Sequence, residues 1–197
     1  MRRLRGALIA VLLTLAACGS PTANQPQSSA TPGSTTPETA ATSVSPSLSP
    51  TNATPGEVSE EQQFSLDDIA EFDDGLLIEI AGAVADKAAK TDRGAEATNG
   101  EIVIASVRIE NKTTKPYHAE NVLIGAKYGS GKDAQIIVDE TDELQSGFTG
   151  MIKPKGESIA TVGFAVPHKE LKKVTFIVDP NDDVHEAISF SGAVPRE

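Results

Sequence analysis

Apolar residues recur at every second position through much of the chain after residue 100. Val103, Ala105, Val107 and Ile109 alternate with polar or charged side chains such as Arg108. Because successive side chains of a β-strand point to opposite faces, this spacing predicts a strand with one face turned toward a core. The same alternation returns in Val122 to Tyr128, Ile136 with Val138, Ala160 to Val166, Val174 to Val178, and Ile188 with Phe190.

Turn-forming residues separate these segments. Asp74-Gly75 stands between the segments 68–72 and 76–84 and is typical of a tight hairpin turn. Further reversals are indicated at Asn99-Gly100, Gly129-Ser130-Gly131 and Pro180-Asn181-Asp182. Apolar runs at the helical period are missing. The pattern therefore predicts an all-β protein, an antiparallel β-sandwich of seven to eight strands, with a small closed barrel as the alternative.

The start of the chain has a different pattern. Arginines at positions 2, 3 and 5 precede an apolar stretch, residues 7–15, which is far shorter than the roughly 20 residues of a membrane-spanning helix. The stretch ends in Leu15-Ala16-Ala17-Cys18, and Cys18 is the single cysteine of the chain. This tetrapeptide resembles the lipobox of bacterial lipoproteins.

The lipobox resemblance implies that residues 1–17 are a signal peptide and that the Cys18 sulfur is diacylated. The acyl chains would hold the mature protein on the extracytoplasmic face of the cell membrane. An ordinary secretory signal peptide and an uncleaved anchor are the alternatives. The resemblance therefore predicts where the protein is located and leaves its ligand open.

Residues 18–60 differ in composition from the rest. Between Ser20 and Pro55 the chain consists almost wholly of Ser, Thr, Pro, Ala, Asn and Gln, without an aromatic residue. Such a segment buries too little apolar surface to offset its chain entropy, so we expect a disordered tether. The folded domain is expected at residues 61–197, and without a second cysteine it has no internal disulfide.

The charge balance is acidic. Without the three leader arginines, 28 carboxylates stand against 14 lysines and arginines, a formal charge of −14. Nucleic-acid binding depends on basic side chains that neutralise phosphates, so nucleic acid is not expected as a partner.

Four short segments of the predicted domain share one further resemblance. They are Phe72-Asp73-Asp74-Gly75-Leu76, Val107-Arg108-Ile109-Glu110-Asn111-Lys112-Thr113, Pro154-Lys155-Gly156-Glu157-Ser158 and Phe164-Ala165-Val166-Pro167. Their order, over about residues 64–193, resembles the immunoglobulin-like secreted and lipid-anchored bacterial domains of unknown function, a group that includes mycobacterial secreted antigens. The resemblance implies an immunoglobulin-like sandwich without established catalytic residues, and an accessory or binding role. An antibody-type domain is excluded, because the chain has no Trp and no cysteine pair.

The sequence holds few residues suited to catalysis. It lacks a Gly-x-Ser-x-Gly elbow, a His-Glu-x-x-His motif and a phosphate-binding glycine loop. Its three histidines, His118, His168 and His185, do not have the spacing of a metal site, and we expect all three at the surface. We therefore expect no enzyme activity and no cofactor.

Two weaker patterns concern binding. Asp179, Asn181, Asp182 and Asp183 offer the oxygen ligands that Ca²⁺ prefers but lack the glycine and distal glutamate of an EF-hand loop, so a solvated acidic surface is the simpler interpretation. Phe148, Met151 and Ile152 interrupt the alternation and indicate either a partner surface or an irregular edge strand that completes the core. We prefer the edge strand.

Together these patterns predict a lipid-anchored lipoprotein that displays a non-catalytic, immunoglobulin-like binding or accessory domain outside the membrane. Its partners would be the membrane, through the lipid on Cys18, and an envelope protein. The alternative is a lipoprotein that binds Ca²⁺ or another small ligand for transport or sensing.

Overall fold

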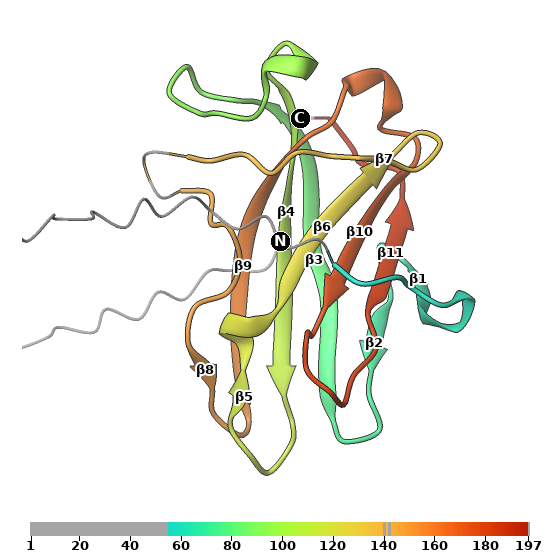
Figure 1. Ribbon diagram of the computed structural model, residues 1–197, viewed down its shortest axis with the longest axis vertical. Coiled ribbons are helices and arrows are strands. Elements are labelled where there is room, and N and C mark those ends of the chain that lie inside the picture. Colours follow the sequence, from blue (N-terminus) through green and yellow to red (C-terminus); the bar gives the residue numbers. More distant parts are fainter. Residues whose placement is uncertain (1–54, 140, 142, 197) are drawn as a thin grey trace, which may run out of the picture. The chain divides into compact units, whose positions relative to one another are not determined.

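The structure is a computed structural model that describes residues 55–139, 141 and 143–196. Within these residues two β-sheets pack face to face (Figure 1). Strand pairs are antiparallel, except for β1 and β11, which run parallel. The predicted all-β, immunoglobulin-like antiparallel sandwich is confirmed, with eleven strands among the described residues where seven to eight were predicted.

The first sheet contains the longest strands. Its order is β2 (Ile69–Glu71), β3 (Leu76–Lys87), β4 (Glu101–Asn111) and β9 (Gly156–Ala165). Val103, Ala105, Val107 and Ile109 of β4 are all fully buried, as the alternation predicts.

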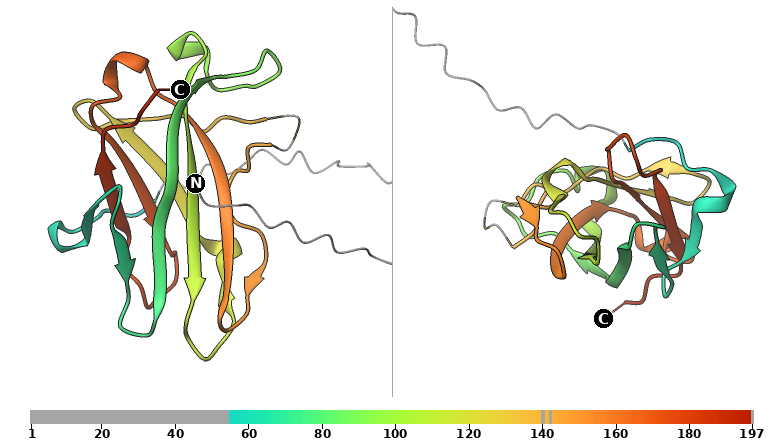
Figure 2. Two further views of the ribbon diagram at one scale, coloured as in Figure 1. Left: turned by 180° about the vertical axis from the view of Figure 1, so that it is seen from behind. Right: turned by 90° about the horizontal axis from the view of Figure 1, so that it is seen from below.

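The second sheet covers the inner face of the first. Its order is β1 (Gln63–Ser65), β11 (Ile188–Gly192), β10 (Val174–Asp179), β6 (Leu123–Tyr128) and β7 (Lys132–Asp133). Figures 1 and 2 show β6, β10 and β11 in one layer and β3, β4 and β9 in the other. Phe164 of β9 meets Phe176 of β10 across the core, with ring centroids 6.0 Å apart, and both side chains are fully buried.

Short elements complete the described chain. A small pair joins β5 (Tyr117–His118) to β8 (Met151–Ile152). Single 3₁₀ turns are η1 (Glu60–Gln62), η2 (Glu96–Thr98), η3 (Ala119–Asn121) and η4 (His168–Glu170). Before the predicted domain start at residue 61, the Gly56 N–H already donates to an Asp179 carboxylate oxygen at 2.6 Å.

A β-bulge divides β3. The register with β4 shifts between Ile80 and Gly82, so that Ala81 has no opposing residue. A strand alternates strictly, and one extra residue therefore moves the inward positions from even to odd numbers. Ile78 and Ile80 are buried before the bulge, whereas Ala85 is the buried position after it.

The outer face of the first sheet is partly covered as well. Ile137 and Ile102 form a second, smaller core with Ala95 and Ala165. The segment that brings in Ile137 runs beside β9, where the Ile137 N–H donates to the Gly163 carbonyl at 2.9 Å. The predicted strand with Ile136 and Val138 on one buried face is therefore wrong: Val138 is 45% exposed, and Ile137 between them is buried.

The predicted hairpin turn at Asp74-Gly75 is confirmed. Gly75 has a φ of +95°, which a residue with a Cβ atom rarely adopts, and its N–H donates to the Phe72 carbonyl. The Leu76 N–H donates to a carboxylate oxygen of Asp74 at 3.0 Å. This turn lies at the lower end of the sandwich in Figure 1, where β4 and β10 also end and β11 begins.

Candidate functional site

A buried histidine occupies the lower end of the sandwich. His185 lies in the loop between β10 and β11, and only 8% of its side chain is exposed. Its Nδ1 atom lies 2.9 Å from Oδ2 of Asp182, and its Nε2 atom lies 3.3 Å from Oδ2 of Asp74 in the β2–β3 turn. The second pair is close enough for an ion pair, but its angles do not make a hydrogen bond, and Nε2 has no other partner among the described residues.

Two aromatic rings enclose this histidine. The Phe72 ring packs edge-on against it, with centroids 4.6 Å apart, and the Tyr117 ring lies at 6.4 Å. The Tyr117 hydroxyl is buried without a hydrogen-bond partner in the described part of the chain. Burial raises the pKa of Tyr117, and the nearby carboxylates of Asp182, Asp179 and Asp74 raise it further, so this phenol stays neutral at physiological pH.

Asp182 holds the histidine loop together. Its carboxylate accepts hydrogen bonds from the backbone N–H groups of Val184 and His185 and contacts the His185 ring. Partial burial alone would raise the pKa of Asp182, but these hydrogen bonds outweigh it and lower the pKa below its ordinary value. The cluster of Phe72, Asp74, Tyr117, Asp182 and His185 thus joins three segments that are distant in the sequence.

We expect Asp182→Asn to lower the free energy of unfolding by about 1 kcal/mol at pH 7, because an amide oxygen is a weaker acceptor for these donors. A carboxyl with a lowered folded-state pKa stabilises the fold above its unfolded pKa, which is about 4, and this contribution is lost as pH falls through the folded value. The difference between the two proteins should therefore shrink below pH 4. Urea unfolding between pH 7 and pH 2 measures it, with Asp133→Asn as the exposed control, and a difference that persists at pH 2 would contradict the assignment.

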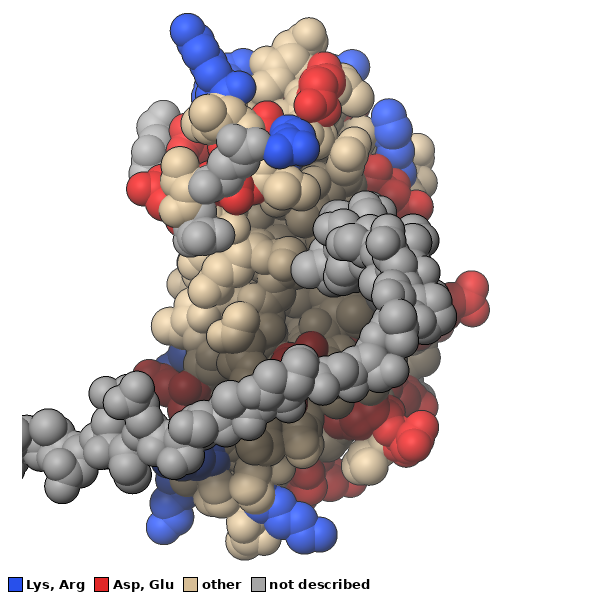
Figure 3. Space-filling view, turned by 60° about the vertical axis from the view of Figure 1, so that its left-hand side comes forward, with Lys and Arg blue, Asp and Glu red and all other residues tan. Residues whose placement is uncertain are grey.

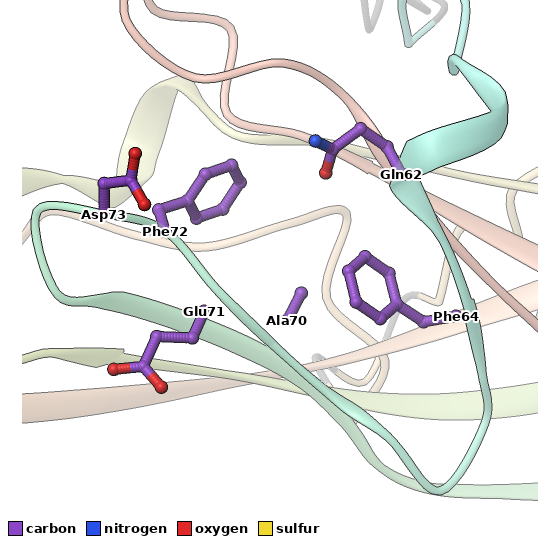
Figure 4. A pocket seen from close by; sticks show the side chains of 6 residues that line it. All are labelled: Gln62, Phe64, Ala70, Glu71, Phe72 and Asp73. Carbon is purple, nitrogen blue, oxygen red and sulfur yellow. The ribbon is translucent and has the colours of Figure 1, made fainter.

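A small pocket lies beside this cluster, between β1 and β2. Its volume is about 170 Å³, and its lining residues are Gln62, Phe64, Ala70, Glu71, Phe72 and Asp73. Figure 4 shows the rings of Phe64 and Phe72 on opposite sides of the space, with the Ala70 methyl group between them. Ligand pockets for whole small molecules usually measure 300–1,000 Å³, so this space suits one side chain or one small head group.

Each phenyl ring of the pocket packs against a second ring. Phe64 packs on Phe190 of β11, with centroids 5.6 Å apart, and Phe72 packs on His185. Each phenyl ring remains partly exposed. The pocket therefore has pre-positioned aromatic walls, and the histidine cluster supports one of them.

The predicted calcium residues do lie together, in the β10–β11 loop and the end of β10. Their oxygens are engaged by donors: Asp179 accepts from the backbone N–H groups of Gly56 and Asn181, and Asp182 from those of the histidine loop. The Asn181 side chain donates to the Asn121 carbonyl at 3.2 Å, while Asp183 is exposed. Among the described residues, no group of three or more His, Cys, Asp or Glu side chains is arranged to hold a metal ion.

The predicted partner surface is corrected at two of its three residues. Phe148, in the loop before β8, and Ile152, which pairs with Tyr117 of β5, are 7% and 5% exposed and belong to the main core. Met151 is 59% exposed. The segment therefore completes the core, as the preferred interpretation holds, but it is mostly loop, and its one short strand pairs with β5 outside the two main sheets.

The three histidines have different environments. The His118 side chain is 60% exposed and lies 2.9 Å from a Glu120 carboxylate oxygen. The His168 ring is 18% exposed and its Nε2 atom lies 3.0 Å from the Asp86 carbonyl. The expectation of three surface histidines is wrong for His185, because loop and turn residues distant in the sequence close over it.

One structural residue was missed in the sequence. Asn111 at the end of β4 is fully buried, and its side-chain amide donates to the carbonyls of Lys115 and Ile152, at 2.8 and 2.9 Å. Its Oδ1 atom accepts from the Thr113 N–H at 3.0 Å. The signal was available, since Asn111 continues the odd-numbered, inward positions of β4.

The predicted signal peptide, the lipidated Cys18 and most of the tether lie outside the described residues. In the part of the chain that is described, no helix has the length and apolar character needed to cross a bilayer.

The surface drawn in Figure 3 carries Asp and Glu side chains in several groups, Lys and Arg mainly toward its two ends, and a mostly uncharged middle.

These features define the protein as a β-sandwich of the immunoglobulin-like type with a closed polar cluster at one end. No family model matches the sequence, and no curated protein matches it either. The fold is nevertheless similar to solved bacterial structures.

Three solved structures illustrate the similarity. The ycdA protein of Bacillus subtilis subsp. subtilis str. 168, described as a lipoprotein, is 14% identical over 60% of this chain and only 36% of its own length, with a TM-score of 0.48. The yjhA protein from Bacillus subtilis is 12% identical over 68% of this chain and 99% of its own, with a TM-score of 0.50. An uncharacterized β-sandwich protein from Clostridium difficile 630 is 14% identical over 71% and 99%, with a TM-score of 0.41. At these identities the similarity concerns the fold alone.

Proposed function

We propose that this protein is a lipid-anchored, extracytoplasmic bacterial lipoprotein whose immunoglobulin-like sandwich is a non-catalytic binding or accessory module. The anchor rests on Leu15-Ala16-Ala17-Cys18 behind the basic leader. The proposal of a binding module is based on the sandwich fold, in which loops and strand edges commonly form binding surfaces.

The pocket between β1 and β2 is the observation that carries the binding role. It has two pre-positioned aromatic walls, and its lining residues include no histidine, serine or cysteine. Its two carboxylates, Glu71 and Asp73, are exposed to solvent. His185, the best proton-transfer group nearby, lies behind Phe72 with its Nδ1 atom bound to Asp182. Recognition is therefore the use that this arrangement supports best.

We expect Cys18→Ala to release the protein from the membrane or to leave the uncleaved precursor, because the thioether-linked lipid requires this sulfur. Fractionation of cells into membrane and soluble material, with an immunoblot for size, measures both outcomes. Ser20→Ala is the matched control and should be processed and anchored as the wild type is. A Cys18→Ala protein that is cleaved and membrane-bound as before would contradict the anchor.

The binding role is tested in intact cells by cross-linking the anchored protein and identifying its neighbours by mass spectrometry. A reproducible envelope protein that is absent from cells with the soluble Cys18→Ala form supports display at the membrane. Stabilisation of the purified domain by millimolar Ca²⁺, seen as a raised Tm, would instead favour the metal-binding alternative.

A further inference from the structure

We propose that the pocket between β1 and β2 receives the lysine or arginine side chain of an extended segment from a partner protein. This inference rests on the proposed binding function and names the chemistry of the partner. It starts from the aromatic walls: the faces of phenyl rings attract cations, and the attraction increases when water is excluded.

The pocket matches a long cationic side chain in shape. Phe64, Phe72 and Ala70 provide apolar contacts for a methylene stem, and the volume of about 170 Å³ leaves room for little more. The Gln62 side chain lies over the opening in Figure 4, where its amide oxygen is able to accept a hydrogen bond from an ammonium or guanidinium group. An apolar side chain would offer that amide no hydrogen bond.

The charges around the pocket favour a cation. Glu71 and Asp73, the rim pair, are among its lining residues, and Figure 4 shows their carboxylates pointing away from the space between the rings. Asp67, Asp68 and Asp74 belong to the same stretch of chain, and residues 62–76 contain no lysine or arginine. The side chains of Glu71 and Asp73 are exposed. They act on an approaching charge through the solvent, and so they affect mainly the rate of association and its dependence on salt.

The strand beside the pocket offers a way to bind the rest of the segment. β2 is the edge strand of its sheet, paired with β3 on one side. An extended peptide adds to such an edge through main-chain hydrogen bonds, and a neighbouring pocket then selects one side chain. The acidic edge and the pocket together specify a basic, extended segment.

The test uses the chain from residue 18 with Cys18→Ala, which keeps every described residue, and a fluorescein-labelled, end-blocked peptide Thr-Val-Lys-Val-Thr. Fluorescence anisotropy should show that this peptide binds about tenfold more tightly than the versions with norleucine or glutamate in place of lysine. A tenfold ratio corresponds to about 1.4 kcal/mol. Equal affinities of the three peptides, or no binding of the lysine peptide, would overturn the proposal.

Variants of the pocket distinguish the contribution of the phenyl rings from that of the acidic side chains. Phe72→Leu should weaken the binding of the lysine peptide at least fivefold. The Tm of this variant is measured as well, because Phe72 also packs on His185. Glu71→Gln with Asp73→Asn changes exposed positions and should slow association and flatten its salt dependence. Asp133→Asn with Glu143→Gln removes the same charge elsewhere and should leave the association rate and its salt dependence unchanged. An effect of the control pair as large as that of the rim pair would overturn the role of the rim.

Two further outcomes separate a failure of this inference from a failure of the proposed function. If n-butylammonium displaces the labelled peptide at the concentration at which the unlabelled peptide does, the pocket binds free amines and the inference about a partner segment is wrong. If intact cells yield an envelope partner that the Phe72→Leu variant retains in full, the pocket is not the contact, although the proposed display function stands.

Discussion

Phe164→Ala or Phe176→Ala is expected to lower the free energy of unfolding by about 3 to 5 kcal/mol. Both rings are fully buried, and they face each other across the two sheets with their ring centroids 6.0 Å apart. Alanine removes the transfer free energy of the ring and leaves a cavity that strands on both sides hold open. Urea unfolding followed by circular dichroism measures the loss.

Arg108→Ala is the matched comparison, because Arg108 stands on β4 beside the fully buried Val107. Its guanidinium contacts Glu79 at 2.8 Å and Glu157 at 3.2 Å on the outer face of the sheet, where its side chain is 33% exposed. Ion pairs whose side chains still reach solvent contribute little, so we expect a loss below about 1 kcal/mol. Similar losses for Arg108 and the two phenylalanines would mean that the inward and outward faces of these strands are wrongly assigned.

Asn111→Ala is expected to lower the free energy of unfolding by about 2 to 4 kcal/mol. The substitution leaves the Ile152 carbonyl and the Thr113 N–H without the partners that the Asn111 side chain supplies. A buried polar group without a partner costs about 1 to 3 kcal/mol. The Lys115 carbonyl keeps a second donor, the Thr113 hydroxyl at 2.9 Å, and adds little to the loss.

Thr113→Ala in the same turn is the control, because its hydrogen bonds with Lys115 are exposed and water replaces them. We expect it to cost less than about 1 kcal/mol. The same urea unfolding assay compares the two variants. If Asn111→Ala were as mild as Thr113→Ala, the side chain would not be the link that holds β4, the following turn and β8 together.

Much of the sandwich could be predicted from the spacing of apolar residues. The inward faces of β4, β6, β9, β10 and β11 were assigned correctly, and so was the turn at Asp74-Gly75. These are local properties: a strand alternates its side chains by geometry, and a glycine at positive φ makes a turn regardless of what surrounds it. The same rule would have placed Asn111 inside had it been applied to a polar residue.

The candidate site depended on contacts that spacing does not encode. The pocket combines Phe64 of β1 with Phe72 at the end of β2, and neither residue belongs to a clear alternating segment. His185 was expected at the surface because it lies near a predicted strand end, in a loop. It is buried because Phe72 and Tyr117, which are far away in the sequence, pack against it.

The sequence by itself determined the class of fold and the inward faces of five strands, because each follows from residues close together in the chain. The tertiary structure alone decided the shift of the inward positions at Ala81, the covering of the outer face by Ile137, and the enclosure of His185. Alternation states which side chains share a face of a strand. Which faces are then covered depends on where distant segments pack, and that is fixed by the free energy of burying the whole set of apolar surfaces together.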